Sequence, residues 1–370
     1  MTIGQPVAES STTYPRAHAT RVLLVALILG LVGTAGCGGP SPGVGTLPGL
    51  TRSDSPAALD KARRWSTYLL GAVDKVPPAT SVFGLEDNLG QPMDCLRIIA
   101  LQSGSYLGVY QVGSGNHFVV DLAVSSDLRT WRELQTLQQN ASQPDLVAAG
   151  GGFLLATEAT TEAGSFSGAH YVNVRYYPSV ASLILGQSAR ALVLPHRLAK
   201  PGSGVEGTPF IVAADMRGGL DHSAITITFH YLSADLVDRE GVGVLTDFST
   251  WSAQEDEPLD EALIHVGLDG KHGDRSFAPG SDSDLEMVEA QRDSASPWEV
   301  YLYNRLSGAV TSLPIRTPGA SRSFANPTIA CVPNPAGATV AVITLFLPNQ
   351  QASPGEAGEL LYYQPSPLCA

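Results

Sequence analysis

Three acidic side chains lie within two residues of a proline or glycine where short apolar runs begin. They are Asp94 in Gln91-Pro-Met-Asp94, Asp145 in Gln143-Pro-Asp145 and Glu206 in Glu206-Gly-Thr-Pro209. Carboxyl groups that surround one ligand can promote its hydrolysis, because a protonated carboxyl helps the leaving oxygen depart while an ionised one activates water. A third carboxylate nearby raises the pKa of the acid by like-charge repulsion. The residue types therefore indicate acid-base hydrolysis.

Other catalytic signatures are missing from the sequence. It has no P-loop, no dinucleotide-binding fingerprint after a strand, no H-E-x-x-H and no G-x-S-x-G elbow between a strand and a helix. It has no C-x-x-C and no close Cys/His pair, so we predict no metal site built on cysteine. The net charge of −13 and the lack of a Lys/Arg-rich run argue against nucleic acid as a partner.

The acidic residues follow a repeat in the chain. From about residue 80 onward, short β-like runs alternate with turns rich in Gly, Pro, Asn, Asp and Ser, which predicts an all-β chain. If Asp94, Asp145, Glu206, Asp274 and Asn326 are equivalent, the intervals between them are 51, 61, 68 and 52 residues. Units of this length suit four strands each, so we predict a five-bladed β-propeller over residues 80–370.

A second recurrence supports this division into units. The segments Ser125-Ser-Asp-Leu-Arg-Thr-Trp131 and Leu245-Thr-Asp-Phe-Ser-Thr-Trp251 share a core of the form [ST]-D-[LF]-x-T-W. Each occurs late in its unit, on the turn before an outer strand. We interpret both tryptophans as packing residues between blades and not as platforms for sugar stacking.

One helix is predicted before the propeller, over residues 55–75. Ser55 or Asp54 can cap it, Pro56 suits its first turn, and apolar residues recur at helical spacing up to Val76-Pro77-Pro78. The helix is expected to pack against the propeller as a brace.

The N-terminus indicates export. Residues 1–36 combine a polar start with the apolar run of a signal peptide, which is too short for a comfortable membrane span. The last three of these residues and the next one form Thr34-Ala-Gly-Cys37, which resembles a bacterial lipobox with Thr34 in place of the usual Leu. We therefore expect a thioether-linked diacylglycerol and an amide-linked acyl chain on Cys37, a flexible tether over residues 37–54, and a location on the outer face of the cytoplasmic membrane. The alternative is an ordinary signal peptide or an uncleaved anchor, with an incidental cysteine.

The chain looks similar to five-bladed propeller glycoside hydrolases of the arabinanase, β-xylosidase, invertase and levansucrase type. The resemblance covers residues 90–365 and depends on the repeat length, the S-x-D-L-x-x-W turn and the acidic strand starts. It implies that Asp94 is the general base, that Asp145 holds the pKa and orientation of the acid, and that Glu206 is the general acid. Glu206-Gly-Thr-Pro209 resembles the family's Glu-Gly-Pro, whereas Asp94-Cys95 stands where the family has Asp-Pro.

The resemblance also implies a polar, acidic mouth that binds sugar. Residues expected to contact substrate there are His230, Arg175, Asp274 and Asn326. Further polar residues beside predicted strands are Glu158, His272, Arg275, Glu289 and Gln291. The expected partner is an extracellular carbohydrate, the chain is expected to be a monomer, and no cofactor is implied, although a few arabinanase-like relatives hold calcium in the tunnel.

Two functions remain open from the sequence, with a structural propeller that binds no ligand as a weaker third. The first is an inverting glycosidase, favoured by the three acidic strand starts. The second is a propeller that binds glycan or protein without catalysis, favoured by the altered first motif and the aromatic content of 7%. With Cys37 lipidated, three cysteines allow at most one disulfide. Because a propeller brings its ends together, we expect Cys95 to pair with Cys369, with Cys331 to Cys369 as the alternative.

Overall fold

The computed structural model describes residues 50, 55–160, 168–200, 204–280 and 284–369. Within these residues the strands form five antiparallel sheets of four strands each, which confirms the predicted all-β, five-bladed propeller. The signal segment, Cys37 and the tether lie outside the described residues, so these predictions remain open. None of the described helices is long and apolar enough to cross a membrane.

The five blades follow one another along the chain. Blade 1 contains β2 Asp94–Ala100, β3 Tyr106–Ser114, β4 His117–Ser125 and β5 Arg132–Gln139. Blade 2 contains β6 Ala141–Ala149, β7 Gly152–Thr160, β8 His170–Tyr177 and β9 Arg190–Val193. Blade 3 contains β10 Glu206–Asp215, β11 Ala224–Leu232, β12 Asp238–Thr246 and β13 Thr250–Glu255. Blade 4 contains β14 His272–Phe277, β15 Leu285–Ala290, β16 Glu299–Asn304 and β17 Ala309–Ser312. Blade 5 contains β18 Ala325–Pro333, β19 Thr339–Leu347, β20 Gly358–Pro365 and β1 Ser81–Val82.

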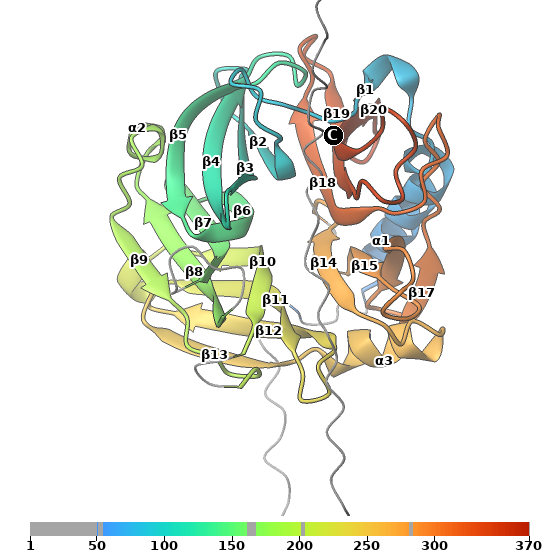
Figure 1. Cartoon of the computed structure of the whole chain (residues 1–370). Coiled ribbons are helices and arrows are strands. Elements are labelled where there is room, and N and C mark those ends of the chain that lie inside the picture. Colours follow the sequence, from blue (N-terminus) through green and yellow to red (C-terminus); the bar gives the residue numbers. More distant parts are fainter. Residues whose placement is uncertain (1–49, 51–54, 161–167, 201–203, 281–283, 370) are drawn as a thin grey trace, which may run out of the picture. The chain divides into compact units, whose positions relative to one another are not determined.

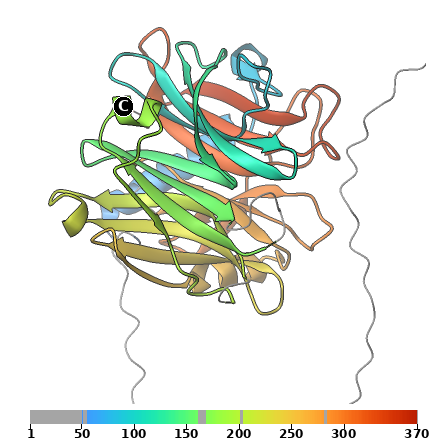
Figure 2. The ribbon, with the colours of Figure 1, turned by 60° about the vertical axis from the view of Figure 1, so that its left-hand side comes forward.

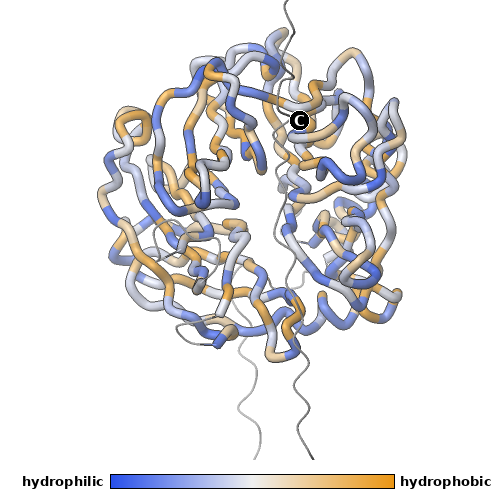
Figure 3. The backbone as a smooth tube through the Cα atoms, in the orientation of Figure 1, coloured by the Kyte–Doolittle hydropathy of each residue, from blue (hydrophilic) through white to orange (hydrophobic). Residues whose placement is uncertain are grey.

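The first strand of each blade lies at the centre of a ring. Strand β2 contacts β6, β6 contacts β10, β10 contacts β14, β14 contacts β18, and β18 returns to β2 (Figure 1). Figure 2 shows the same sheets from another side, stacked face against face around the axis. The apolar cores lie between neighbouring sheets: Leu154 of blade 2 shares one cluster with Ile225 of blade 3. Apolar stretches accordingly occur in every blade (Figure 3).

Both tryptophans of the repeated turn are packing residues, as predicted. Trp131 and Trp251 are each 3% exposed. A Cβ on Gly108 would lie 2.8 Å from the Trp131 ring, and one on Gly243 would lie 2.3 Å from the Trp251 ring. Each indole therefore covers a glycine of its own blade, and only a residue without a side chain fits beneath it.

Chain segments from both ends close the ring. The N-terminal strand β1 is the fourth strand of blade 5, where Ser81 pairs with Tyr362 and Val82 with Leu361. A disulfide joins Cys331 on β18 to Cys369 after β20. The expected pair of Cys95 with Cys369 is wrong, and Cys95 is free and buried. The direction of the last strands explains this pairing.

Strand β20 ends beside Val340, and Val340 pairs with Val332. The C-terminus therefore emerges at the end of blade 5 where Cys331 lies. Cys95 lies near the start of β2, at the opposite end of the inner strands.

The N-terminal helix is α1, Pro56–Tyr68, which continues as a π-helical turn, η1, Leu69–Val73. Its side chains Trp65, Leu69 and Val73 are fully buried in one cluster with residues of blades 4 and 5. The Tyr362 hydroxyl donates to the Val73 carbonyl at 2.7 Å. The helix is thus a brace, as predicted. The other helical segments are η2 Pro78–Thr80, α2 Val180–Ile184, η3 Leu220–His222 and α3 Glu257–His265.

Replacing Ser55 by alanine should weaken this brace slightly. The Ser55 hydroxyl accepts a hydrogen bond from the Ala58 N–H and caps the helix. Loss of such a cap lowers the free energy of unfolding by about 1 kcal/mol, which urea denaturation would measure. Thr67→Ala, at an exposed position near the end of α1, is the control and should not destabilise. Equal effects of the two changes would contradict the capping role.

Candidate functional site

Every inner strand carries a two-residue irregularity near its start. The strands pair regularly at Asp94, Ser142, Gly207, His272 and Ala325, and pairing resumes three residues later at Arg97, Asp145, Phe210, Arg275 and Thr328. The first irregular residue has a positive φ in four of the five blades: Cys95 57°, Gln143 49°, Thr208 47° and Asn326 50°. We call this feature the entry bulge.

The entry bulges are capped by side-chain oxygens from other strands. Those oxygens belong to Glu359, Gln111, Glu158 and Glu289, and they accept the bulge N–H of Cys95, Gln143, Thr208 and Asn326 respectively. A bulge N–H has no ladder partner, so a buried acceptor is needed to satisfy it. Several of the acidic residues near the mouth are therefore part of the fold itself.

The bulge register shows that the predicted equivalence of five acidic and amide residues is wrong. Asp94 directly precedes the bulge of its strand, whereas Glu206 is separated from the bulge of its own strand by Gly207. Asn326 is the first bulge residue, Asp274 is the second, and Asp145 follows its bulge. The five residues therefore do not occupy equivalent positions on their strands, although Asp145 and Asp274 both contact Arg97.

Arg97 occupies the centre of the ring. Its Nη2 donates to Asp274 of blade 4 at 2.5 Å, and its Nε lies 3.9 Å from Asp145 of blade 2. Its Nη1 donates to the Pro327 carbonyl of blade 5 at 3.4 Å, and its guanidinium lies 5.6 Å from the ring centroid of Phe210 in blade 3. One side chain of blade 1 thus contacts the other four blades.

Asp145 and Asp274 are partners of this guanidinium. Asp145 is 3% exposed, and its Oδ2 also accepts the Ile211 N–H at 2.7 Å. Burial raises the pKa of Asp145 to about 6, against the opposing charge of Arg97 and the amide. Burial likewise raises the pKa of Asp274, against Arg97. The Asn326 side chain completes the centre, because it donates across the ring to Gln143 at 2.8 Å.

Glu206 is held by backbone amides. It is 1% exposed, and its Oε1 accepts the N–H groups of Arg197 at 2.7 Å, Leu198 at 2.7 Å and Ala199 at 3.0 Å. These three residues belong to the segment that joins β9 to β10. Compared with Glu-Gly-Pro, the chain has the additional residue Thr208 before Pro209. One extra residue turns a strand side chain to the other face.

Asp94 is the most accessible of the three predicted catalytic residues. It is partly buried at the start of β2, opposite Gln111. Burial raises the pKa of Asp94 to about 6. Its neighbour Glu359 is buried, and burial followed by the charge of Asp94 raises the pKa of Glu359 well above its usual range. Of the three predicted catalytic residues, Asp94 is therefore the one best suited to act as a proton donor.

Two of the predicted substrate contacts lie elsewhere than the centre. His230 lies on β11 opposite Gly207, close enough for its charge to act on Glu158. Arg175 lies on β8, the third strand of blade 2, where its Nε donates to Asn173 at 3.2 Å. Arg175 therefore belongs to the blade and not to the mouth. Arg275 is also structural, because it is paired with buried Asp256 at 2.6 Å.

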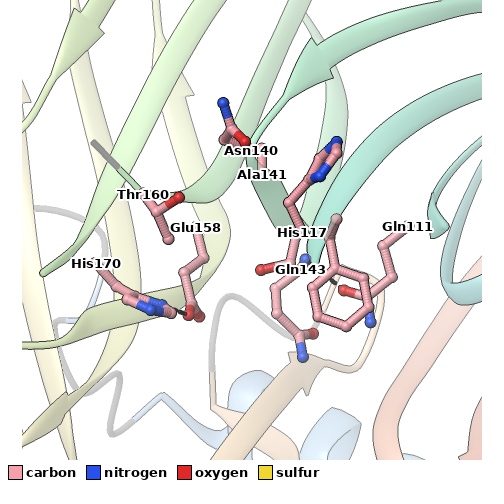
Figure 4. Close-up of a pocket in the computed structure, with 10 residues that line it drawn as sticks. Gln111, His117, Asn140, Ala141, Gln143, Glu158, Thr160 and His170 are labelled. Atoms are coloured by element: carbon pink, nitrogen blue, oxygen red, sulfur yellow. Dashed lines mark hydrogen bonds and ion pairs between the residues drawn. The ribbon is translucent and has the colours of Figure 1, made fainter. Parts of the chain in front are cut away.

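A pocket of about 210 Å³ lies between blades 1 and 2, beside the entry bulge of β6. Figure 4 shows Glu158 and His170 directed at one another on one side, and Gln143, Gln111 and His117 on the other. The ten lining residues are Gln111, His117, Phe118, Asn140, Ala141, Ser142, Gln143, Glu158, Thr160 and His170. Among the polar side chains of this pocket, only Glu158 was predicted from the sequence as a candidate site residue, and Gln143 was noted only as part of the Gln143-Pro-Asp145 motif.

Glu158 is the carboxylate of the pocket. Its Oε1 bonds His170 Nδ1, and its Oε2 accepts the Thr208 N–H at 3.0 Å. Burial alone would raise the pKa of Glu158, but the His170 hydrogen bond, the charges of His230 and His170, and the Thr208 amide together lower it. A Cβ on Gly207 would lie 2.0 Å from Glu158 Oε2, so only glycine fits beside this carboxylate.

Within the described ranges, no three or more His, Cys, Asp or Glu side chains are arranged to hold a metal ion.

Comparisons with known proteins find likeness in structure only. No protein-family model and no curated protein sequence matches the chain. An α-L-arabinofuranosidase from Lactobacillus brevis is similar at 9% identity and TM-score 0.48, over 79% of this chain and 93% of that one. A family 117 glycoside hydrolase of Zobellia galactanivorans has 12% identity and TM-score 0.46, over 77% and 89%. An α-L-arabinanase of Cellvibrio cellulosa has 12% identity and TM-score 0.44, over 74% and 91%.

Proposed function

We propose that the protein is a carbohydrate-binding propeller that is displayed on the outer face of the cytoplasmic membrane through a lipid on Cys37. The Thr34-Ala-Gly-Cys37 motif supports the anchor. The disulfide between Cys331 and Cys369 supports export, because disulfides persist in oxidising compartments and are rare in the cytosol. An anchored receptor would keep its ligand beside the cell.

The pocket between blades 1 and 2 is the observation that carries the proposal. It places amide, hydroxyl and imidazole groups around a small space, together with the ring of Phe118. A sugar offers matching hydroxyl donors and acceptors, with apolar C–H groups that suit an aromatic ring. Neither lysine nor arginine is among the ten lining residues, so the pocket provides no fixed positive charge for an anionic ligand.

Changing Glu158 to glutamine should weaken glycan binding about tenfold, because a hydrogen bond to a charged acceptor is worth about 1.5–3 kcal/mol. The readout is titration calorimetry of the purified protein with arabinan, xylan and fructan oligosaccharides. Glu257→Gln, on the exposed start of α3, is the matched control and should bind like the unchanged protein. Binding that is equal in both variants would exclude the pocket, and absence of binding to a broad glycan panel would exclude the proposed function.

Glycoside hydrolysis is the second candidate function, and the environment of Asp94 favours it. A carboxyl with a pKa near 6 is a suitable general acid close to neutrality. The other two carboxylates of the expected set are engaged by Arg97 and by backbone amides. Turnover of aryl-glycosides that is lost in Asp94→Asn would establish the enzyme. Glycan binding without turnover would support the receptor.

A further inference from the structure

Glu206 holds a segment that lies against the pocket wall. The segment is Leu194–Lys200, between β9 and β10, and we call it the wall segment. Three successive N–H groups of this segment converge on Glu206 Oε1, at 2.7, 2.7 and 3.0 Å. Hydrogen bonds to a carboxylate are roughly twice as strong as neutral ones, so this buried contact anchors the segment.

His196 connects the wall segment to the pocket. Its Nε2 lies 2.8 Å from the His170 carbonyl, and its Nδ1 lies 3.1 Å from the Lys200 carbonyl. Its ring stacks on Tyr171, with centroids 4.1 Å apart and an interplanar angle of 11°. Nε2 and one ring face therefore dock the segment onto the start of β8, whereas Nδ1 binds the end of the segment itself.

The residue on which His196 docks is a pocket residue. The His170 N–H donates to the Gly204 carbonyl at 3.1 Å, and its ring bonds the Glu158 carboxylate that faces the cavity. Contacts thus run from Glu206 through the wall segment and His196 to His170 and Glu158. Each link is a hydrogen bond, a ring stack or a covalent connection.

We propose that Glu206 is a positioning residue, which fixes the wall segment so that His170 orients Glu158 toward a bound ligand. The proposal rests on the pocket being the carbohydrate site. The resemblance implied that Glu206 is a general acid. In the role proposed here, Glu206 acts by accepting hydrogen bonds and does not need to donate a proton.

Two substitutions at one position separate these tasks. Glutamine keeps a carbonyl oxygen that can accept the three N–H groups but cannot donate a proton as an acid. Alanine removes both abilities. We expect Glu206→Gln to bind glycan within about threefold of the unchanged protein, and Glu206→Ala to lose about tenfold or more.

Limited proteolysis gives a readout that does not need a ligand. Arg197 is exposed in the wall segment, and its guanidinium donates to the Trp251 carbonyl at 2.8 Å. Trypsin cleavage after Arg197, mapped by mass spectrometry on the full chain, should accelerate in Glu206→Ala and stay at the original rate in Glu206→Gln. Should Glu206→Ala fail to fold, His196→Ala tests the link from the other side, with the same expected cleavage and loss of affinity.

The outcomes distinguish the two proposals. Turnover that is lost in Glu206→Gln while the cleavage rate stays unchanged would identify Glu206 as a general acid and overturn the positioning role. Unchanged cleavage and affinity in both Glu206→Ala and His196→Ala would also overturn it. If no glycan binds while cleavage after Arg197 accelerates, the wall segment is anchored as described and the proposed function is what fails.

Discussion

Replacing Arg97 with methionine is expected to lower the free energy of unfolding by about 3–5 kcal/mol, the range found when one partner of a buried ion pair is removed. Methionine is similar in length and apolar, so the change removes the charge with little change in packing. The carboxylates of Asp145 and Asp274 would then lie buried without a cation. Guanidinium denaturation with linear extrapolation would measure the loss.

Two further variants test the cause of that loss. Arg132→Met, at an exposed position on β5, should change the free energy of unfolding by less than about 0.5 kcal/mol. Adding Asp274→Asn to Arg97→Met removes one of the two stranded carboxylates and should recover part of the stability. An Arg97→Met protein as stable as the original would mean that Arg97 does not tie the blades together.

The free energy of unfolding is expected to fall as the pH rises from about 4.5 to 8. Glu289 is 5% exposed and caps the Asp274 N–H at 2.9 Å. Burial, followed by the charge of Asp274, raises the pKa of Glu289 from 4.5 to about 8. The protonated form is therefore favoured by folding, and its contribution is complete below pH 4.5 and lost as the pH approaches 8. Each unit of such a shift corresponds to about 1.4 kcal/mol.

Asp94 and Asp145 also make the free energy of unfolding fall with rising pH, but over a lower pH range. The pKa of each is raised from 3.8 to about 6. Urea midpoints at pH 5, 6.5 and 8 would measure the combined slope. Working above pH 5 avoids the opposite effect of Glu158, whose pKa is lowered and whose contribution is lost in acid. In Glu289→Gln the slope should become shallower, whatever the absolute stability of that variant. A stability that stays level or rises toward pH 8 would contradict these pKa shifts.

The architecture could be predicted from local patterns. The spacing of turns, the lack of helical periodicity and the repeat length of the chain all predicted five blades of four strands. The helix that contains Trp65 follows from its cap, its proline and its 3.6-residue period. Trp131 and Trp251 could be identified as packing residues because their turns recur. These features depend on residues close together in the chain, so the sequence alone determined them.

The site depended on contacts between distant residues. Side chains on a strand alternate with a period of two, and each entry bulge inserts a residue, so the direction of Glu206 depends on a register that residue types do not reveal. Arg97 has no motif, and its partners in four other blades are brought to it only when the ring closes. The pairing of Cys331 with Cys369 likewise depends on the direction of the last strands. The sequence determined which chemical groups are present and how many blades carry them, whereas the tertiary structure decided which groups face the centre and which face the pocket.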